Sequence, residues 1–115
     1  MRAPKRGEVW YADLDPVRGH EQAGRRRVLI VSTTEFNEGP AGLVIVTPMT
    51  THDRGIYFQV SIEAREGGLS RPSVIKCEDI RSIDQRRLTR CIGEVSASTM
   101  AAVDTKLRAL LKLYD

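Results

Sequence analysis

Residues 5–32 read KRGEVWYADLDPVRGHEQAGRRRVLIVS, two apolar runs separated by a segment rich in glycine and charge. The first run, residues 7–13, carries Val, Trp and Tyr in partial alternation, which predicts a β-strand. A loop should begin at Asp15-Pro16, because proline holds the preceding residue extended and cannot continue a ladder. The second run, residues 28–31, is apolar at every position, so it predicts a strand buried on both faces.

Turn residues and short apolar runs alternate along the rest of the chain. Residues 37–42, NEGPAG, predict a turn, and so does Gly67-Gly68. Residues 43–49 predict another buried strand, whose ladder we expect to break at Pro48. Further short strands are expected at residues 57–62, 73–77, 80–83 and 91–95.

The period of the apolar residues changes near the end of the chain. Ser96 or Ser98 can cap the start of a helix there, and we expect the helix to pack its apolar stripe on the core. Roughly five to seven short strands followed by one helix predict a mainly β fold, a small curled antiparallel barrel with a C-terminal helix. The helical stripe consists of Met100, Val103, Leu107, Leu110, Leu111 and Tyr114.

The chain length of 115 residues predicts a single domain over residues 1–115. Because so small a domain can leave a sheet edge or an apolar face uncovered, we expect a homodimer. No apolar stretch approaches the roughly 20 residues of a membrane span, and no apolar segment follows the basic N-terminus as in a signal peptide. Cys77 and Cys91 form no CxxC pair, so we expect a cytoplasmic protein without disulfides.

The net charge of +3 and the pI of about 9.1 permit an anionic partner such as nucleic acid without demanding one. Basic residues cluster at positions 25–27 and 86–90, and charge alone favours a solvated surface for each cluster. Metal-ligand spacings, a Walker loop and a GxGxxG motif are absent from the sequence, so we expect neither a metal nor a cofactor.

Chemistry in this chain would therefore be metal-independent and would rely on Arg, Thr, Glu or His. These residue types suit RNA cleavage, because RNA carries its own nucleophile, the 2′-hydroxyl group. The planar guanidinium of arginine matches a phosphate through two parallel hydrogen bonds and stabilises developing negative charge.

Three stretches, in this order and spacing, resemble the MazF/PemK/Kid family of toxin endoribonucleases. They are residues 5–32, residues 46–55 (VTPMTTHDRG) and residues 78–88 (EDIRSIDQRRL). The resemblance continues into the C-terminal helix, so it covers nearly the whole chain. It implies an SH3-like barrel of strongly bent antiparallel sheet, usually homodimeric.

The resemblance also implies an activity and two partners. Members cut single-stranded RNA such as mRNA without metal and leave a 2′,3′-cyclic phosphate and a 5′-hydroxyl. A cognate MazE-like antitoxin covers the RNA groove with an extended acidic and apolar segment. By the motif Glu-Gln-x-Gly-x-Arg and the strand-end threonine, the catalytic positions fall on Arg26 and Thr50. Substrate contacts are expected from His20, Glu21, Gln22, Arg25, Arg27, Arg54 and Arg81.

Several assignments remain open at the level of sequence. Relatives commonly carry proline at the position of Arg27. In an extended segment, Arg25 and Arg27 point to one face and Arg26 to the other, and alternation does not say which face holds the site. We assign the catalytic position to Arg26 because of its spacing from Gly24 in the motif.

Other residues have rival interpretations. Thr51 is a rival of its neighbour Thr50. Glu21 is either a general base or a structural partner of an arginine. His20 and His52 lie in predicted loops, and we expect them at the surface first, as RNA contacts second and as catalytic groups third.

Two alternative functions come from other classes. Toxins of similar fold inhibit DNA gyrase without catalysis, but those relatives lack the Glu-Gln-x-Gly-x-Arg pattern. The second alternative is a catalytically idle RNA-binding module. Sequence alone does not give the RNA sequence that is recognised.

Overall fold

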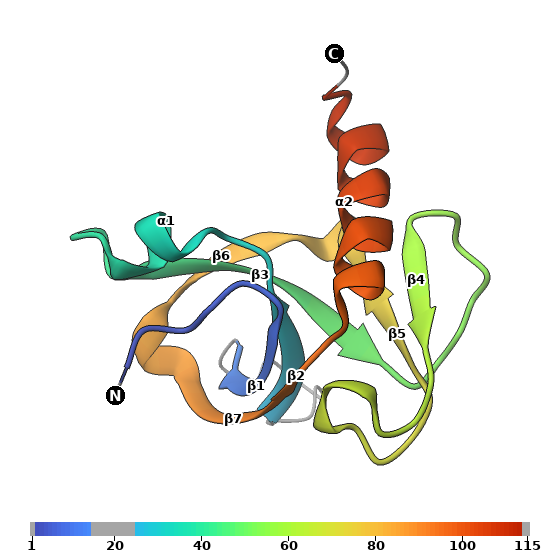
Figure 1. Cartoon of the computed structure of the whole chain (residues 1–115), viewed down its shortest axis with the longest axis horizontal. Helices are drawn as coiled ribbons and strands as arrows, with labels where there is room; N and C mark the ends of the chain where they lie inside the picture. The colour runs from blue at the N-terminus through green and yellow to red at the C-terminus, as the bar shows by residue number, and fades with distance from the viewer. Residues whose placement is uncertain (1, 15–24, 114–115) are drawn as a thin grey trace, which may run out of the picture.

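The computed structural model describes residues 2–14 and 25–113. Short strands are followed by a long helix at the end of the chain, as the sequence predicts, and a short helix that was not predicted lies after the second strand (Figure 1). The strands are β1 (Glu8–Asp13), β2 (Arg25–Ile30), β3 (Leu43–Thr50), β4 (Gln59–Ile62), β5 (Ser73–Lys76), β6 (Arg81–Asp84) and β7 (Leu88–Glu94). The helices are α1 (Thr34–Glu38) and α2 (Ala97–Leu111), and 3-10 turns form η1 (Glu66–Gly68), η2 (Cys77–Asp79) and η3 (Gln85–Arg87).

All strand pairs are antiparallel, in the order β4-β5-β3-β2-β1-β7, and β6 pairs with β3. The sheet curls strongly, so that β1, β2, β3 and β7 wrap around a common interior (Figure 1). Register shifts between β1 and β7 contribute to the bend, because an extra residue on one strand increases its local twist. The predicted mainly β fold with a C-terminal helix is confirmed.

The strand β2 is buried on both faces, as its continuous apolar run predicts. Val28 and Ile30 pack in one apolar cluster with Trp10, whereas Leu29 packs in a second cluster with Val9. The side chains of Val28, Leu29 and Ile30 are all fully buried. The buried half of the strand therefore fixes the backbone that carries the arginines at its more exposed N-terminal end.

The strand β3 lies at the centre of the fold. Val46 pairs with Ile30 of β2 on one edge and with Arg81 of β6 on the other. The strand itself continues through Pro48 to Thr50. The predicted break of its ladder at Pro48 is confirmed, because the pairing with β2 ends at Val28–Pro48. What changes near Pro48 is the partner, since β6 ends its pairing at Val46 and β5 takes over at Met49.

Other expected boundaries differ in detail. The predicted turn at residues 37–42 begins later, because α1 includes Asn37 and Glu38. Asn37 is buried, and its side-chain amide donates hydrogen bonds to the carbonyl oxygens of Pro4 and Ser32. The strand β4 starts at Gln59 rather than at residue 57, and β7 starts at Leu88 rather than at residue 91.

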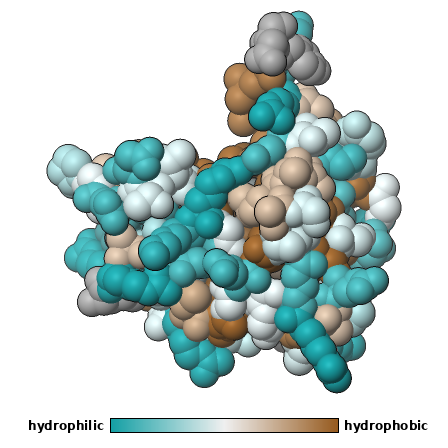
Figure 2. Space-filling model, in the orientation of Figure 1, coloured by the Kyte–Doolittle hydropathy of each residue, from teal (hydrophilic) through white to brown (hydrophobic). Residues whose placement is uncertain are grey.

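The helix α2 is capped by Ser96, whose hydroxyl oxygen accepts a hydrogen bond from the Thr99 N–H at 3.1 Å. Val103 is fully buried, so the predicted packing on the core is confirmed for this part of the stripe. It is wrong for Leu111, which is 49% exposed because the end of α2 projects beyond the sheet (Figures 1 and 2). Tyr114 lies outside the described residues.

Candidate active site

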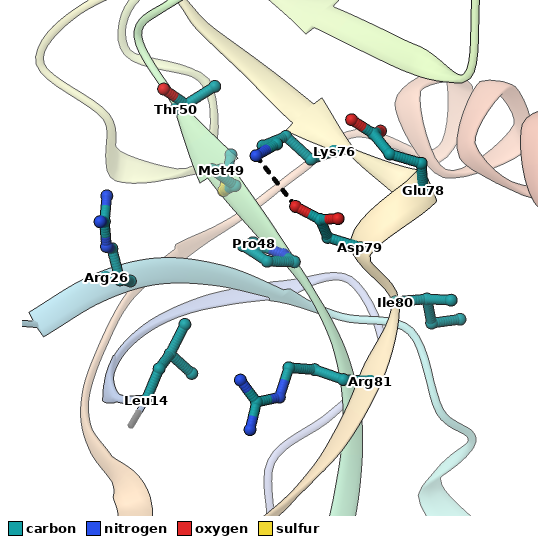
Figure 3. A pocket seen from close by; sticks show the side chains of 10 residues that line it. All are labelled: Leu14, Arg26, Pro48, Met49, Thr50, Lys76, Glu78, Asp79, Ile80 and Arg81. Atoms are coloured by element: carbon teal, nitrogen blue, oxygen red, sulfur yellow. Dashed lines mark ion pairs between the residues drawn. The ribbon is translucent and has the colours of Figure 1, made fainter. Parts of the chain in front are cut away.

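A pocket of about 550 Å³ opens where β2 and β3 separate (Figure 3). Its walls come from β2, β3, β5, β6 and η2, together with Leu14, which follows β1. The lining residues are Leu14, Arg26, Pro48, Met49, Thr50, Lys76, Glu78, Asp79, Ile80 and Arg81.

Pro48 helps to explain why a pocket forms here. The segment from β5 to β6 follows one edge of β3, but between the Met49–Ile75 and Val46–Arg81 pairs it turns away as η2. Proline has no N–H to donate to a ladder. Pro48 therefore loses no hydrogen bond of its own as a donor where the neighbouring segment turns away. The detour lines the pocket with the side chains of η2.

Arg26 and Thr50 meet at the open end of the β2–β3 ladder. The last pair of this ladder is Val28 with Pro48, and continuing the same register places Arg26 opposite Thr50. Side chains two residues apart on a strand share a face, so both point to the same side as Val28 and Pro48. The rival Thr51 falls opposite Arg25 in this register and does not line the pocket.

The alternation along β2 separates the three arginines. Arg26 lines the pocket, whereas the guanidinium of Arg25 lies 5.1 Å from the ring centre of Tyr11 on β1. Arg27 Nη1 donates a hydrogen bond of 2.8 Å to Ser73 Oγ, at the start of β5. Arg26 is thus the β2 arginine on the same face as Thr50.

The hydroxyl of Thr50 is oriented by the chain that follows it. Thr50 Oγ1 accepts a hydrogen bond of 3.1 Å from the backbone N–H of His52. A hydroxyl group has one donor hydrogen and two acceptor lone pairs, so this contact leaves the Thr50 hydrogen available for a bound anion.

Positive and negative groups both line the pocket. Arg26 lies beside one edge of β3, and Lys76 and Asp79 lie beside the other (Figure 3). Lys76 Nζ and Asp79 Oδ2 form an ion pair of 2.9 Å, which offsets part of the positive charge. Gln59 Nε2 donates a hydrogen bond of 2.7 Å to Glu78 Oε2 at the adjoining wall.

The cysteine nearest the pocket is not suited to nucleophilic attack. Cys77, the first residue of η2, is fully buried, and burial raises the pKa of its thiol to about 11. A thiol with such a pKa stays protonated at neutral pH. Within residues 2–14 and 25–113, no three His, Cys, Asp or Glu side chains are grouped so that they could hold a metal ion.

Comparison with known proteins decides the family. Residues 5–111 match the family described as PemK-like, MazF-like toxin of type II toxin–antitoxin system. The chain belongs to this family. It is 38% identical to endoribonuclease MazF9 of Mycobacterium tuberculosis, with 96% of this chain and 98% of the relative covered. It is also 38% identical to endoribonuclease EndoA of Bacillus subtilis, with 96% and 97% covered.

A solved structure agrees with this assignment. The crystal structure of MazE–MazF from Deinococcus radiodurans superposes with a TM-score of 0.84 at 33% identity, covering 99% of this chain and all of that chain. The resemblance inferred from the sequence motifs and the fold expected for the PemK/MazF family are therefore confirmed.

The remaining predicted site residues fall into four groups. Arg81 lines the same pocket as Arg26 and Thr50. Arg54 and His52 are exposed and line an adjoining hollow of about 240 Å³, which Thr50 also borders. Arg25 and Arg27 border another adjoining hollow with Thr50. His20, Glu21 and Gln22 lie outside the described residues.

Three charged residues of the pocket were not identified as site residues from the sequence. Lys76, Glu78 and Asp79 flank the buried Cys77, and their spacing alone resembles that of an ordinary solvated turn. The detour at Pro48, which no local pattern encodes, brings them to the catalytic candidates.

Proposed function

We propose that this chain is the endoribonuclease toxin of a type II toxin–antitoxin pair, acting on single-stranded RNA such as mRNA in the cytoplasm. The observation that carries the proposal is the placement of Arg26 and Thr50 on one face at the open end of the β2–β3 ladder. The relatives named endoribonucleases, at 38% identity over most of the chain, support the activity. The family match over residues 5–111 supports a single toxin domain.

The proposed reaction is a transesterification within the RNA. The 2′-oxygen attacks the adjacent phosphorus, a 2′-O–P bond forms, and the bond from phosphorus to the 5′-oxygen breaks. The proton of the 2′-hydroxyl passes to a general base, and the leaving 5′-oxygen gains a proton. The products are a 2′,3′-cyclic phosphate and a 5′-hydroxyl, with no net gain or loss of water.

Arg26 and Thr50 stabilise the charge that develops on the phosphate. The Arg26 guanidinium donates two parallel hydrogen bonds to nonbridging oxygens, and the Thr50 hydroxyl donates one. Both donors are held by strands that are anchored in the core, so little reorganisation is required during the reaction. Arginine remains charged at neutral pH, which suits it to this role better than to that of a base.

The neighbouring cations bind the rest of the substrate. Arg81 extends the pocket along β6, and Arg54 extends it past His52. Arg25 and Arg27 contact phosphates beside the cut. We also assign His20, Glu21 and Gln22 to substrate binding. Glu21 is the first candidate for the general base.

Two protein partners complete the proposal. A MazE-like antitoxin inhibits the toxin by covering the pocket, as supported by the MazE–MazF complex from Deinococcus radiodurans. A second copy of the chain forms a homodimer, which is supported by the exposed apolar side chains of Leu111 and Leu113 at the projecting end of α2. No specific observation favours a gyrase inhibitor.

The test compares two oligonucleotides in excess EDTA, identical except for a 2′-deoxy substitution at the cut. We expect the protein to cleave the ribonucleotide and to leave the deoxy substrate intact, because the nucleophile is missing from the latter. Equal cleavage of both would refute the proposed reaction. Gyrase supercoiling measured in parallel should be unaffected.

A further inference from the structure

A second basic surface lies on the other face of β2 from Arg26. Tyr11 of β1 is its centre, and arginines from both flanking strands approach its ring. The guanidinium carbon of Arg25 on β2 lies 5.1 Å from the ring centre, and that of Arg90 on β7 lies 5.5 Å from it. We call the side chains of Tyr11, Arg25, Arg27, Arg71 and Arg90 the Tyr11 face.

Four side chains of the Tyr11 face line a hollow of about 300 Å³, namely Tyr11, Arg25, Arg27 and Arg71. Arg90 belongs to the face through its contact with the Tyr11 ring. Among the residues that the structure describes, the lining of the hollow includes Arg25, Arg27 and Arg71 and no Asp or Glu, unlike the pocket of Arg26 and Thr50. Asp13 stands opposite Arg25 in the β1–β2 register but is not part of this lining. Like charges so close together repel one another, which favours an anion in the hollow.

Arg27 is fixed at the edge of this hollow. Its Nη1 donates to Ser73 Oγ at 2.8 Å, and Ser73 Oγ donates to the carbonyl oxygen of Arg71 at 3.1 Å. Ser73 is buried, so the link ties β2 to the start of β5. The arginine at a position where proline was expected therefore has a structural partner and faces the hollow.

The hollow continues into the candidate active site. Arg25, Arg27 and Thr51 line both this hollow and the smaller one that Arg26 and Thr50 border. A nucleic-acid strand with its reacting phosphate at Thr50 can thus pass the N-terminal end of β2 and reach the Tyr11 face without leaving a basic surface.

The chemistry of the Tyr11 face matches a flanking nucleotide. Arginine forks bind phosphate oxygens, and tyrosine rings and guanidinium planes stack on bases of any sequence. We propose that the Tyr11 face is a subsite that binds RNA outside the cleaved bond, by its phosphodiester backbone and one stacked base. That the bound nucleic acid is the RNA substrate follows from the proposed function.

The test uses two RNA substrates with the same cut site, one with about two flanking nucleotides on each side and one with about eight. Arg90→Gln and Tyr11→Leu should raise KM for the long substrate about fivefold or more and leave the short substrate unchanged. Arg90→Gln should also reduce the salt dependence of binding by about 0.7 in the log–log slope for a lost phosphate contact. Tyr11→Phe, which keeps the ring, should behave as the wild type.

Arg108→Gln is the matched control, because it removes one positive charge from an exposed position on α2. Wild-type KM for the long substrate in both Arg90→Gln and Tyr11→Leu would overturn the subsite, and so would equal losses on both substrates. A third measurement separates this result from failure of the proposed function. If the wild type cuts neither substrate, anisotropy with a 12-nucleotide single-stranded DNA still tests the face, and unchanged affinity in Arg90→Gln would overturn it.

Discussion

Arg26 and Thr50 line the same pocket, and continuing the β2–β3 register two residues beyond its last pair, Val28 with Pro48, places them opposite each other. The pairing of β3 with β2 ends at that point, and on the opposite edge of β3 the partner changes from β6 to β5. The open end of the ladder thus presents a guanidinium and a hydroxyl to the same pocket. This relationship is the basis of the first prediction.

Removing either side-chain donor should slow RNA cleavage sharply. We expect Arg26→Ala and Thr50→Val each to reduce kcat by about 100-fold or more, the usual effect of losing one donor to a developing oxyanion. Thr50→Ser, which keeps the hydroxyl, should retain most activity. Turnover of a fluorogenic RNA measures all three, with circular dichroism to check the fold.

Thr51→Val and Thr105→Val distinguish this role from general damage. Thr51 falls on the other face in the extended register, and the Thr105 hydroxyl donates to the Ala101 carbonyl on the exposed side of α2. Thr51→Val should reduce kcat far less than Thr50→Val, and Thr105→Val should have wild-type activity. A larger loss for Thr51→Val would move the catalytic hydroxyl to Thr51.

Asp79 should weaken the binding of RNA. Its ion pair with Lys76, at 2.9 Å, holds a negative charge in the pocket. We expect Asp79→Asn to lower KM at low salt by about two- to fivefold, with the difference shrinking as salt screens the charges. Glu35→Gln, at an exposed position on α1, should leave KM unchanged. An increased KM in Asp79→Asn would show that Asp79 positions Lys76 instead.

Glu8 should make the fold sensitive to acid. It is 6% exposed, and it accepts hydrogen bonds from Lys5 N–H at 2.8 Å and from Trp10 Nε1 at 3.1 Å, and pairs with Arg2 at 2.8 Å. Burial alone would raise the pKa of Glu8, but the hydrogen bonds from Arg2, Lys5 and Trp10 hold it below its usual value. Its stabilising effect is therefore present above the unfolded-state pKa and is lost as pH falls through the folded-state pKa.

Urea unfolding at several pH values measures this effect. Glu8→Gln should lower the free energy of unfolding by about 1–3 kcal/mol at pH 7, as expected for disrupted buried hydrogen bonds to a charged group. The difference from wild type should shrink below pH ~4.5, where Glu8 becomes protonated in the unfolded chain. A difference that grows with acid would contradict the assigned direction. The exposed Glu94→Gln is the control.

Gly68 should be essential for the crossing of η1 over β7. A Cβ at Gly68 would lie 1.9 Å from the carbonyl oxygen of Ile92, and Gly68 has a φ of +80°. Gly68→Ala should therefore destabilise the fold by much more than Gly42→Ala. Gly42 has a similar φ of +69° with nothing within 4 Å, so it should cost only about 1–2 kcal/mol of conformational strain. Equal losses in denaturant unfolding would rule out the backbone clash.

Local patterns predicted the features that are encoded locally. The continuous apolar run at residues 28–31 identified β2, and the serines before the apolar stripe of α2 gave two candidate caps, of which the structure selects Ser96. The helix α1 was missed because its five residues are too few for a period, and it is fixed instead by tertiary hydrogen bonds of Asn37. The exposure of the end of α2 was not predicted, because the apolar stripe of a helix carries no information on where the sheet beneath it ends.

The residues of the candidate site also divide into those that sequence motifs predicted and those that depend on the tertiary structure. The motif spacing predicted Arg26 and Thr50. The structure adds the β2–β3 register, which places them opposite each other when it is continued past its last pair. Lys76 and Asp79 were missed because their approach depends on a detour between β5 and β6. The link from Arg27 to Ser73 joins strands that are distant in sequence, which single-strand alternation does not predict.

The most direct measurement of the proposed chemistry is the mass of the ends formed from an oligonucleotide with one ribonucleotide at the cut. The wild type, in excess EDTA, should give only a 2′,3′-cyclic phosphate and a 5′-hydroxyl, and Arg26→Ala should give the same ends far more slowly. A 3′-hydroxyl with a 5′-phosphate, or wild-type rates in Arg26→Ala, would contradict in-line attack by the 2′-hydroxyl at the Arg26–Thr50 site.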